Sequence, residues 1–270
     1  MCELAGKVAL VAGASRMAGV GRATALALAA RGCDVTVTGT ARDPSTFPEI
    51  ERKAGWRGVD SVAGEVRDLG RRSLAMSVDV TRADQVQEMV DRTLERLGRV
   101  DILVNLAVAP RGPDRAPVTE LPEEVFRLAL DVKVVGTFLC SRAVARELVR
   151  QGEGGKIVNV SSAFGKSGPA NAAAYSAANA AIHGFTMSFA REMAPHRVNV
   201  NTVCPGLLDT SRIVMVGRGE AWGRLTAQVP LGRAGTPADV AGLIAFLCTP
   251  SASYIHGQCI NVNGGSLMEH

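Results

Sequence analysis

The sequence predicts an α/β protein with one doubly wound domain, in which a mostly parallel sheet of seven strands carries helices on both faces. Three observations support this prediction. Short runs of β-branched and other apolar residues alternate with longer segments in which apolar residues recur at helical spacing. The short runs are apolar throughout, as in strands buried on both faces. No linker interrupts the 270 residues, so we expect one domain over residues 1–270.

The seven predicted strands are short apolar runs, and polar residues or glycines mark their ends. The first, KVALVA, stops at Gly13, which suits a buried parallel strand that turns sharply into a helix. The predicted strands are 7–12, 35–38, 74–78, 100–105, 156–160, 197–203 and 258–262.

The predicted helices fill most of the intervals between these strands. Thr236 is expected to cap the last helix, with Pro237 in its first turn. The polar segment 41–58 contains Pro44 and Pro48 and predicts an extended loop. The predicted helices are 19–31, 59–69, 83–97, 122–150, 172–194 and 237–248.

The composition excludes several classes of protein. Apolar residues make up 47% and charged residues 21%, which is ordinary for a globular protein. The net charge of +4 comes without a basic run, which argues against nucleic-acid binding. No 18-residue apolar run or signal peptide is evident, so we expect a cytoplasmic protein outside the membrane. The six scattered cysteines form no C-x-x-C pair, so we expect neither a metal site nor a disulfide framework.

A glycine-rich segment joins the first strand to the first helix. Gly13, Gly19 and Gly21 would let the backbone approach a pyrophosphate at the N-terminus of the helix. The spacing between the first two of these glycines is irregular, with six residues from Gly13 to Gly19. Because tight turns also use glycine, the glycines alone are weak evidence for a dinucleotide site. Its position after the first strand nevertheless favours a dinucleotide site, which includes Ser15 and Val20.

The end of the second strand indicates which dinucleotide binds. An acidic residue there would bind the adenosine ribose of NAD, but this chain has Thr40 and Arg42. Arg42 and Arg16 could face the extra phosphate of NADP(H), which we therefore expect as the cofactor, although both could simply lie in solvent. Asp79, after the third strand, could meet the adenine or cap the next helix.

Several segments together resemble one family. Ser162 precedes Tyr175 by thirteen residues, and the chain has only two tyrosines. With these landmarks the chain resembles the short-chain dehydrogenase/reductases, most closely the 3-oxoacyl-carrier-protein reductases and related ketoreductases. The matching segments are 13–21, 79–80, 100–105, 205–210, 230–233, 257–258 and 263–265.

The resemblance implies a Rossmann fold and an NADPH-dependent oxidoreductase that reduces a carbonyl, of the ketone or 3-oxoacyl thioester type. Tyr175 would donate the proton and Ser162 would orient the substrate oxygen. Residues 211–229 would form a substrate lid, and the protein would be a homo-oligomer, a tetramer or a dimer. The further cofactor contacts that it implies are Val80, Asn105, Tyr175, Asn179, Pro205, Gly206, Leu208 and Thr210.

The chain departs from the family pattern at the catalytic lysine. Asn179 stands four residues after Tyr175, where the family has Lys, and Lys133 stands on the long helix where the family has Asn. We therefore expect Lys133 to supply the missing ammonium, directly or through water, and to stabilise the phenolate of Tyr175. The alternative is that Lys133 extends to solvent and the site is weakened.

Two other functions stay open at this stage. Reduction of a C=N group would depend less on a tuned tyrosine, so the altered Lys133/Asn179 site could serve it. A cofactor-binding protein with little redox activity would also tolerate Asn179, although Ser162, Tyr175 and Thr210 argue against that reading.

Overall fold

The structure, a computed structural model, describes residues 2–269, apart from the side chains of residues 214–216. Seven strands form one sheet in the order β3-β2-β1-β4-β5-β6-β7. Every neighbouring pair is parallel, which confirms the predicted architecture. The strands are β1 (Val8–Ala12), β2 (Asp34–Gly39), β3 (Ser73–Ser77), β4 (Ile102–Asn105), β5 (Gly155–Val160), β6 (Val198–Pro205) and β7 (Cys259–Val262).

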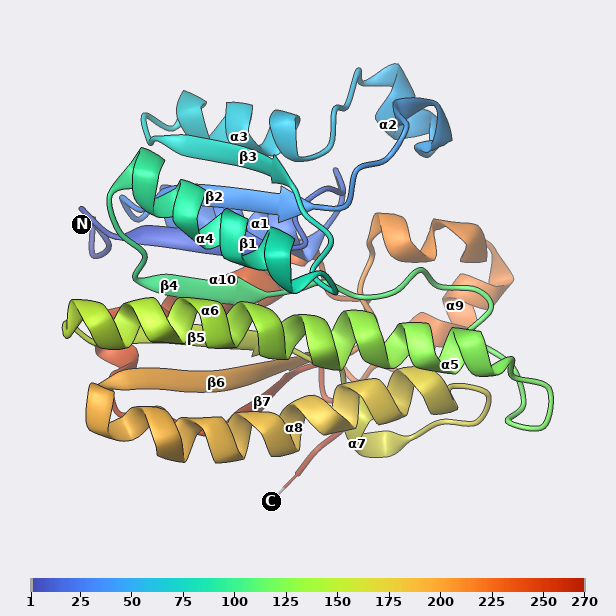
Figure 1. Cartoon of the computed structure of the whole chain (residues 1–270). Helices are drawn as coiled ribbons and strands as arrows, with labels where there is room; N and C mark the ends of the chain where they lie inside the picture. The colour runs from blue at the N-terminus through green and yellow to red at the C-terminus, as the bar shows by residue number, and fades with distance from the viewer. Residues whose placement is uncertain (1, 270) are drawn as a thin grey trace.

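Helices cover both faces of the sheet (Figure 1). One face packs on α1, α3 and α10, through residues such as Leu28, Val62 and Ile244. The other packs on α4, α6 and α8, through residues such as Met89 and Val144. The principal helices are α1 (Val20–Ala29), α3 (Val59–Asp68), α4 (Ala83–Leu97), α5 (Glu123–Leu130), α6 (Gly136–Gln151), α8 (Ala173–Met193) and α10 (Pro237–Leu247).

The carboxyl ends of all the strands point to the same side of the molecule, where α2, α5 and α9 also lie (Figure 1). β1 pairs with β2 on one side and with β4 on the other, so the chain reverses its direction of winding at β1. In an open α/β sheet, a ligand binds in the crevice at this reversal. The shorter elements are η1 (Pro44–Thr46), α2 (Glu49–Lys53), α7 (Phe164–Ser167), η3 (Ala194–His196), η4 (Ser211–Val216), α9 (Glu220–Ala227) and η5 (Pro250–Ala252).

The prediction of an extended loop over 41–58 was wrong in part, because the segment contains η1 and α2. Asp43 caps the first of them, accepting a hydrogen bond from Ser45 N at 2.9 Å. In α2, Glu49 lies in the first turn and Lys53 in the last, which complements the helix dipole. Five residues give too short an apolar pattern for periodicity to detect.

The predicted helix 122–150 is interrupted by one π-helical turn, η2 (Asp131–Val135), which carries Lys133. Such turns insert a residue into the helix and are frequent at functional sites. Gly136 follows directly, and a Cβ there would lie 2.6 Å from Val80 Cγ2, so only glycine lets the helix pass so closely over the end of β3. Within residues 2–269, no helix is long and apolar enough to cross a membrane.

Candidate active site

The glycine loop turns tightly between β1 and α1. Gly13 has a φ of +104°, and a Cβ there would lie 2.7 Å from Ala107 N. A Cβ on Gly21 would lie 2.3 Å from Gly13 O. Gly19 caps α1 without a side chain, and the first turn contains no acidic residue. A close backbone turn at an unobstructed helix N-terminus fits the pyrophosphate of a dinucleotide.

Residues of the unexpected α2 segment hold this loop. The buried carboxylate of Glu51 accepts hydrogen bonds from Met17 N at 3.2 Å and from Ser211 Oγ at 2.9 Å. Trp56 Nε1 donates to Ser15 O at 2.8 Å. The 41–58 segment therefore joins the glycine loop to the start of the predicted lid. Nothing in the local pattern indicated this role, because the contacts link residues 34 to 160 positions apart.

The predicted adenosine end of the site lies at the carboxyl ends of β2 and β3. A hollow of about 550 Å³ is lined there by Thr40 and Asp79. Arg42 is exposed nearby, and Arg16 is half-buried. Burial lowers the pKa of Arg16, and the charge of Arg42 lowers it further, against the opposing effect of the Glu51 carboxylate. Asp79 also accepts from Thr81 N at 3.0 Å in the turn before α4, but the N-cap of that helix is Arg82, without a side-chain cap, so the alternative in which Asp79 caps the helix was wrong.

Ser162 and Tyr175 lie on either side of α7. Ser162 follows β5 and is 8% exposed, and its Oγ accepts a hydrogen bond from Phe164 N at 3.2 Å. The ring of Phe164 meets that of Tyr175 edge to face, with centroids 6.1 Å apart. Phe164 thus links the strand-end hydroxyl to the phenol at the start of α8.

Asn179 lies one turn after Tyr175 and is 1% exposed. Its Nδ2 donates to Tyr175 O at 2.8 Å, and its own main-chain oxygen accepts from Ser161 Oγ at 3.0 Å. The side-chain amide therefore secures the turn of α8 that holds Tyr175. A short polar side chain in a helix commonly makes this bond to the carbonyl four residues earlier.

Lys133 is 3% exposed and does not extend to solvent. Its Nζ donates to Val160 O at the end of β5 and to Ala107 O at 3.3 Å. Burial, aided by the charge of Arg212, lowers its pKa to about 7. Among the described residues no hydrogen bond joins Lys133 to Tyr175 or Asn179, so the predicted exchange of roles stays a prediction. The ammonium does lie at the strand ends that carry Ser162.

Asn105 faces the interior and not the crevice. Its Nδ2 donates to Asn159 Oδ1 at 2.9 Å and to Ser141 Oγ at 3.0 Å. Asn159 in turn donates to Thr186 Oγ1 at 2.9 Å. This buried network fixes β4, β5 and α8 relative to one another, so Asn105 acts on the site through the placement of α8.

The segment after β6 approaches the site from a third direction. Pro205 ends the strand, and Gly206 is so close to Asn263 that a Cβ would lie 2.6 Å from its Cβ. Leu208 pairs with Gly235 in an isolated bridge, and Thr210 O accepts from Ile213 N at 3.1 Å. The predicted lid follows as η4 and α9, and the side chains of 214–216 within it lie outside the described residues.

Two arginines that the sequence did not single out lie over Tyr175. The guanidinium carbon of Arg115 is 4.4 Å from the ring centroid of Tyr175, and that of Arg212 is 5.4 Å away. Arg115 lies in the loop after β4 and Arg212 at the start of the predicted lid. Because the two come from distant segments, their meeting at Tyr175 has no signal in sequence spacing.

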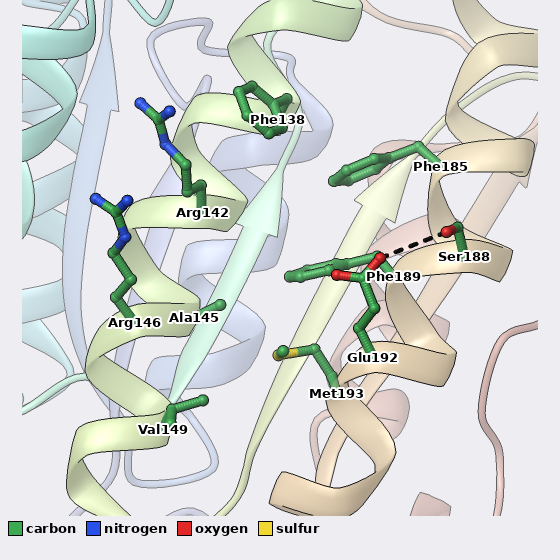
Figure 2. Close-up of a pocket in the computed structure, with 10 residues that line it drawn as sticks. All are labelled: Phe138, Arg142, Ala145, Arg146, Val149, Phe185, Ser188, Phe189, Glu192 and Met193. Atoms are coloured by element: carbon green, nitrogen blue, oxygen red, sulfur yellow. Dashed lines mark hydrogen bonds between the residues drawn. The ribbon is translucent and has the colours of Figure 1, made fainter.

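A second hollow, of about 470 Å³, lies between α6 and α8 and contains none of the predicted site residues (Figure 2). Its walls carry the rings of Phe138, Phe185 and Phe189. The ring of Phe185 stacks on that of Phe189 at 5.3 Å and meets Phe138 edge to face at 6.5 Å. The walls of this groove are mostly apolar, with Arg142, Arg146 and Glu192 among the lining residues.

The parallel sheet, the glycine loop and the Ser162/Tyr175 pair define a dinucleotide-dependent oxidoreductase of the α/β class. The family model described as enoyl-(acyl carrier protein) reductase matches residues 13–266. The chain belongs to the short-chain dehydrogenase/reductase family.

Similar proteins agree with this assignment over nearly the whole chain. The 3-oxoacyl-[acyl-carrier-protein] reductase of Synechocystis is 37% identical over 99% of this chain and 100% of the relative. The cyclohexanol dehydrogenase of Rhodococcus is also 37% identical, over 97% and 96%. The crystal structure of a candidate short-chain alcohol dehydrogenase from Sinorhizobium meliloti 1021 is 32% identical, covers 98% of both chains and has a TM-score of 0.86.

Proposed function

We propose that the protein is an NADPH-dependent reductase of a carbonyl compound, a ketone or 3-oxoacyl thioester. The observation that carries the proposal is that Phe164 links Ser162 to Tyr175, since its N–H donates to Ser162 Oγ and its ring meets that of Tyr175. Relatives named as 3-oxoacyl-[acyl-carrier-protein] reductase and cyclohexanol dehydrogenase act on carbonyl and alcohol pairs, which supports the same reaction class.

In this reaction the residues of the chain manage the proton. The Tyr175 hydroxyl donates a proton to the carbonyl oxygen as that oxygen gains charge, and the Ser162 hydroxyl donates a hydrogen bond to the same atom. NADPH, when bound, supplies the hydride that reduces the carbonyl carbon. Residues 211–229 close over the substrate and exclude water, as lid segments do. Asn179 holds the turn of α8 that carries Tyr175.

The proposed cofactor contacts follow the crevice from one end to the other. Gly13, Ser15, Gly19, Val20 and Gly21 hold the pyrophosphate at the N-terminus of α1. The remaining contacts line the adenosine end, the ribose and the nicotinamide: Arg16, Thr40, Arg42, Asp79, Val80, Tyr175, Asn179, Pro205, Gly206, Leu208 and Thr210.

The experiment that tests the function follows NADPH and NADH oxidation with ketones, acyl thioesters and cyclic imines. We expect reduction of a carbonyl class and a preference for NADPH. Replacing Arg42 or Arg16 with alanine should lower kcat/KM for NADPH by about 10- to 100-fold, because each guanidinium forms charge-assisted hydrogen bonds to the 2′-phosphate. The rate with NADH should change little. If the ratio of kcat/KM for NADPH to kcat/KM for NADH is the same in both variants as in the wild type, the cofactor assignment is wrong.

The three substrate classes separate the proposal from its alternatives. Turnover of imines alone would assign the altered Lys133/Asn179 site to C=N reduction. Tight NADPH binding without turnover of any substrate would favour a binding protein.

The matched control for the Arg42 and Arg16 variants is Arg67→Ala, an exposed substitution on α3, because this side chain lies outside the crevice.

We also propose that the α6/α8 groove pairs two copies of the chain. Phe138 and Val149 are about 40% exposed there, and with Phe185 and Phe189 they line one apolar groove, the kind of contiguous patch that marks a protein contact. Arg142 and Arg146 line the α6 wall, and Glu192 lines the α8 wall (Figure 2). A two-fold pairing would set the arginines of one copy against the glutamate of the other.

Phe138→Glu is expected to shift the protein to a smaller species in sedimentation velocity. The change removes the apolar ring from the interface and buries a charge there, which costs free energy even beside Arg142, whose guanidinium carbon lies 5.0 Å from the Phe138 ring centroid. Leu69→Glu is the control, because Leu69 is similarly exposed at the end of α3, away from the groove. Unchanged sedimentation of Phe138→Glu would place the interface elsewhere.

A further inference from the structure

Among the described residues, Asp114 is the one acid that pairs with the two guanidiniums over Tyr175. Asp114 is buried, and its Oδ2 accepts a hydrogen bond from Arg115 Nη1 at 2.9 Å. The same oxygen is 4.0 Å from Arg212 Nη2, beyond hydrogen-bond distance. Asp114 Oδ1 is occupied by Gly112 N at 2.9 Å. The carboxylate of Asp114 is therefore committed to Arg115 and to its own loop.

Arg212 has one guanidinium nitrogen that makes no hydrogen bond with the described residues and whose ion-pair partner, Asp114 Oδ2, is 4.0 Å away. Its Nη1 donates to Ala109 O at 2.6 Å, but Nη2 is buried and makes no hydrogen bond with any described residue. A buried guanidinium donor left unpaired is costly, because charged groups lose more on desolvation than neutral ones. The guanidinium of Arg212 beside the Tyr175 ring therefore has room for one more hydrogen-bond acceptor, which a bound ligand could provide.

The surroundings give this position a positive potential. Arg111 lies close enough to lower the pKa of both Arg115 and Arg212 through charge repulsion, although burial is the larger cause for each. Asp114 is the one acid of this group in the part of the chain that the structure describes, so the three arginines leave an excess of two positive charges. A planar guanidinium pair of this kind matches a carboxylate in geometry as well as in charge.

We propose that the substrate is a short oxo acid whose carboxylate binds between Arg115 and Arg212 while Tyr175 faces its carbonyl group. This inference rests on the proposed carbonyl reduction at Tyr175 and narrows its substrate class. Both guanidinium carbons lie within 5.4 Å of the Tyr175 ring centroid, so few bonds separate the carboxylate from the carbonyl. The two arginines then determine specificity, and Tyr175 serves the reaction itself.

The test compares each acid with its uncharged ester. The probes are 3-oxobutanoate, 4-oxopentanoate and 4-oxocyclohexanecarboxylate, with the methyl ester of each, at saturating NADPH. For at least one pair we expect kcat/KM for the acid to exceed that for the ester by about tenfold or more, since a site built for a charged group discriminates against its neutral analogue. In Arg212→Met and Arg115→Met this ratio should fall towards one, with the ester rate within about threefold of the wild type.

Two further variants make the result specific. Arg212→Lys keeps the charge but loses the planar donors, so part of the preference for the acid should remain. Arg127→Met, an exposed change on α5, should leave both rates unchanged. Circular dichroism melting of each variant checks the fold. The Kd of NADPH should be the same in wild type and Arg212→Met, and a weaker Kd would assign the guanidinium to the cofactor and overturn the proposal.

A binding measurement separates failure of this inference from failure of the proposed function. Glutarate, which cannot be reduced, should bind the NADP⁺ complex saturably in calorimetry, and Arg212→Met should weaken it about tenfold or more. If no ketone is reduced but glutarate binding depends on Arg212, the carboxylate site stands without the reductase function.

If ketones and esters are reduced with the same kcat/KM as the acids, and glutarate does not bind, the inference is wrong and the reductase function holds. An equal loss of acid and ester turnover would show that the arginines serve Tyr175, which also overturns the inference.

Discussion

Replacing Tyr175 with phenylalanine is expected to reduce kcat by about 10²- to 10⁴-fold, the usual effect of removing a positioned proton donor. Phenylalanine retains the ring that packs under Arg115 at 4.4 Å and against Phe164 at 6.1 Å. The substitution thus removes one oxygen and leaves the packing of α8 in place. Steady-state reduction of the best carbonyl substrate from the panel measures the effect. Fluorescence titration with NADPH should show a Kd raised by no more than about tenfold, the loss of the one hydrogen bond that the phenol is proposed to make to the cofactor.

The second tyrosine of the chain provides the matched control. Tyr254 is fully exposed, so Tyr254→Phe should have wild-type turnover. Ser162→Ala should give an intermediate loss, because it removes a hydrogen bond to the developing oxyanion but not the proton donor. If Tyr175→Phe retains more than about a tenth of the wild-type rate, Tyr175 is not the proton donor and another group must fill that role.

Local patterns predicted most of the architecture because each pattern reports on its own segment. The apolar run before Gly13 gave β1, and the periodicity over 83–97 gave α4 with the same bounds as in the structure. The capping box of Thr236 and Asp239 confirms the predicted start of α10. In these segments the residue propensities, the apolar periodicity and the capping residues all predict the same secondary structure, and the structure confirms it.

The parts of the site that the sequence did not predict depend on contacts between distant segments. Glu51 meets Ser211 across 160 residues, and Arg212 meets Ala109 across 103. No spacing rule covers such pairs. The direction of the Asn105 side chain was equally hidden, because a strand-end asparagine serves a crevice or a buried network with the same local sequence. The motif predicted where the chemistry lies, and only the three-dimensional structure shows the charges around it.

The structure sharpens the hypothesis that Lys133 compensates for Asn179. A lysine that extended to solvent would keep its ordinary pKa, whereas burial lowers the pKa of Lys133 to about 7. Near neutral pH the amine is then both donor and acceptor in comparable amounts, as a proton relay requires. The carbonyls of Val160 and Ala107 hold it at the ends of β5 and β4, on the same side of the sheet as Tyr175.

Lys133→Met should lower turnover by about tenfold or more and change its pH dependence. Wild-type reduction should decline as the pH rises through about 7, because the ammonium that restores the proton of Tyr175 is lost, and this limb should be absent in the variant. The double variant Lys133→Asn/Asn179→Lys, which places each residue type where the family has it, should recover much of the rate. Full activity of Lys133→Met at every pH would rule out the relay.

Stability gives an independent measurement of the same ammonium. In the unfolded chain Lys133 titrates near 10.5 and in the folded chain near 7, so the unfolded state binds more protons between these values. The free energy of unfolding of the wild type should therefore rise with pH from about 7 to about 10.5. Below pH 7 the buried charge costs its full penalty, roughly 5 kcal/mol from the change in pKa, and Lys133→Met should show its largest gain in stability there. Urea unfolding of both proteins at pH 6 and pH 9 measures this difference. A gain equal at the two pH values would mean that Lys133 is not held as an isolated buried ammonium, and that its proton cannot serve Tyr175 near neutral pH.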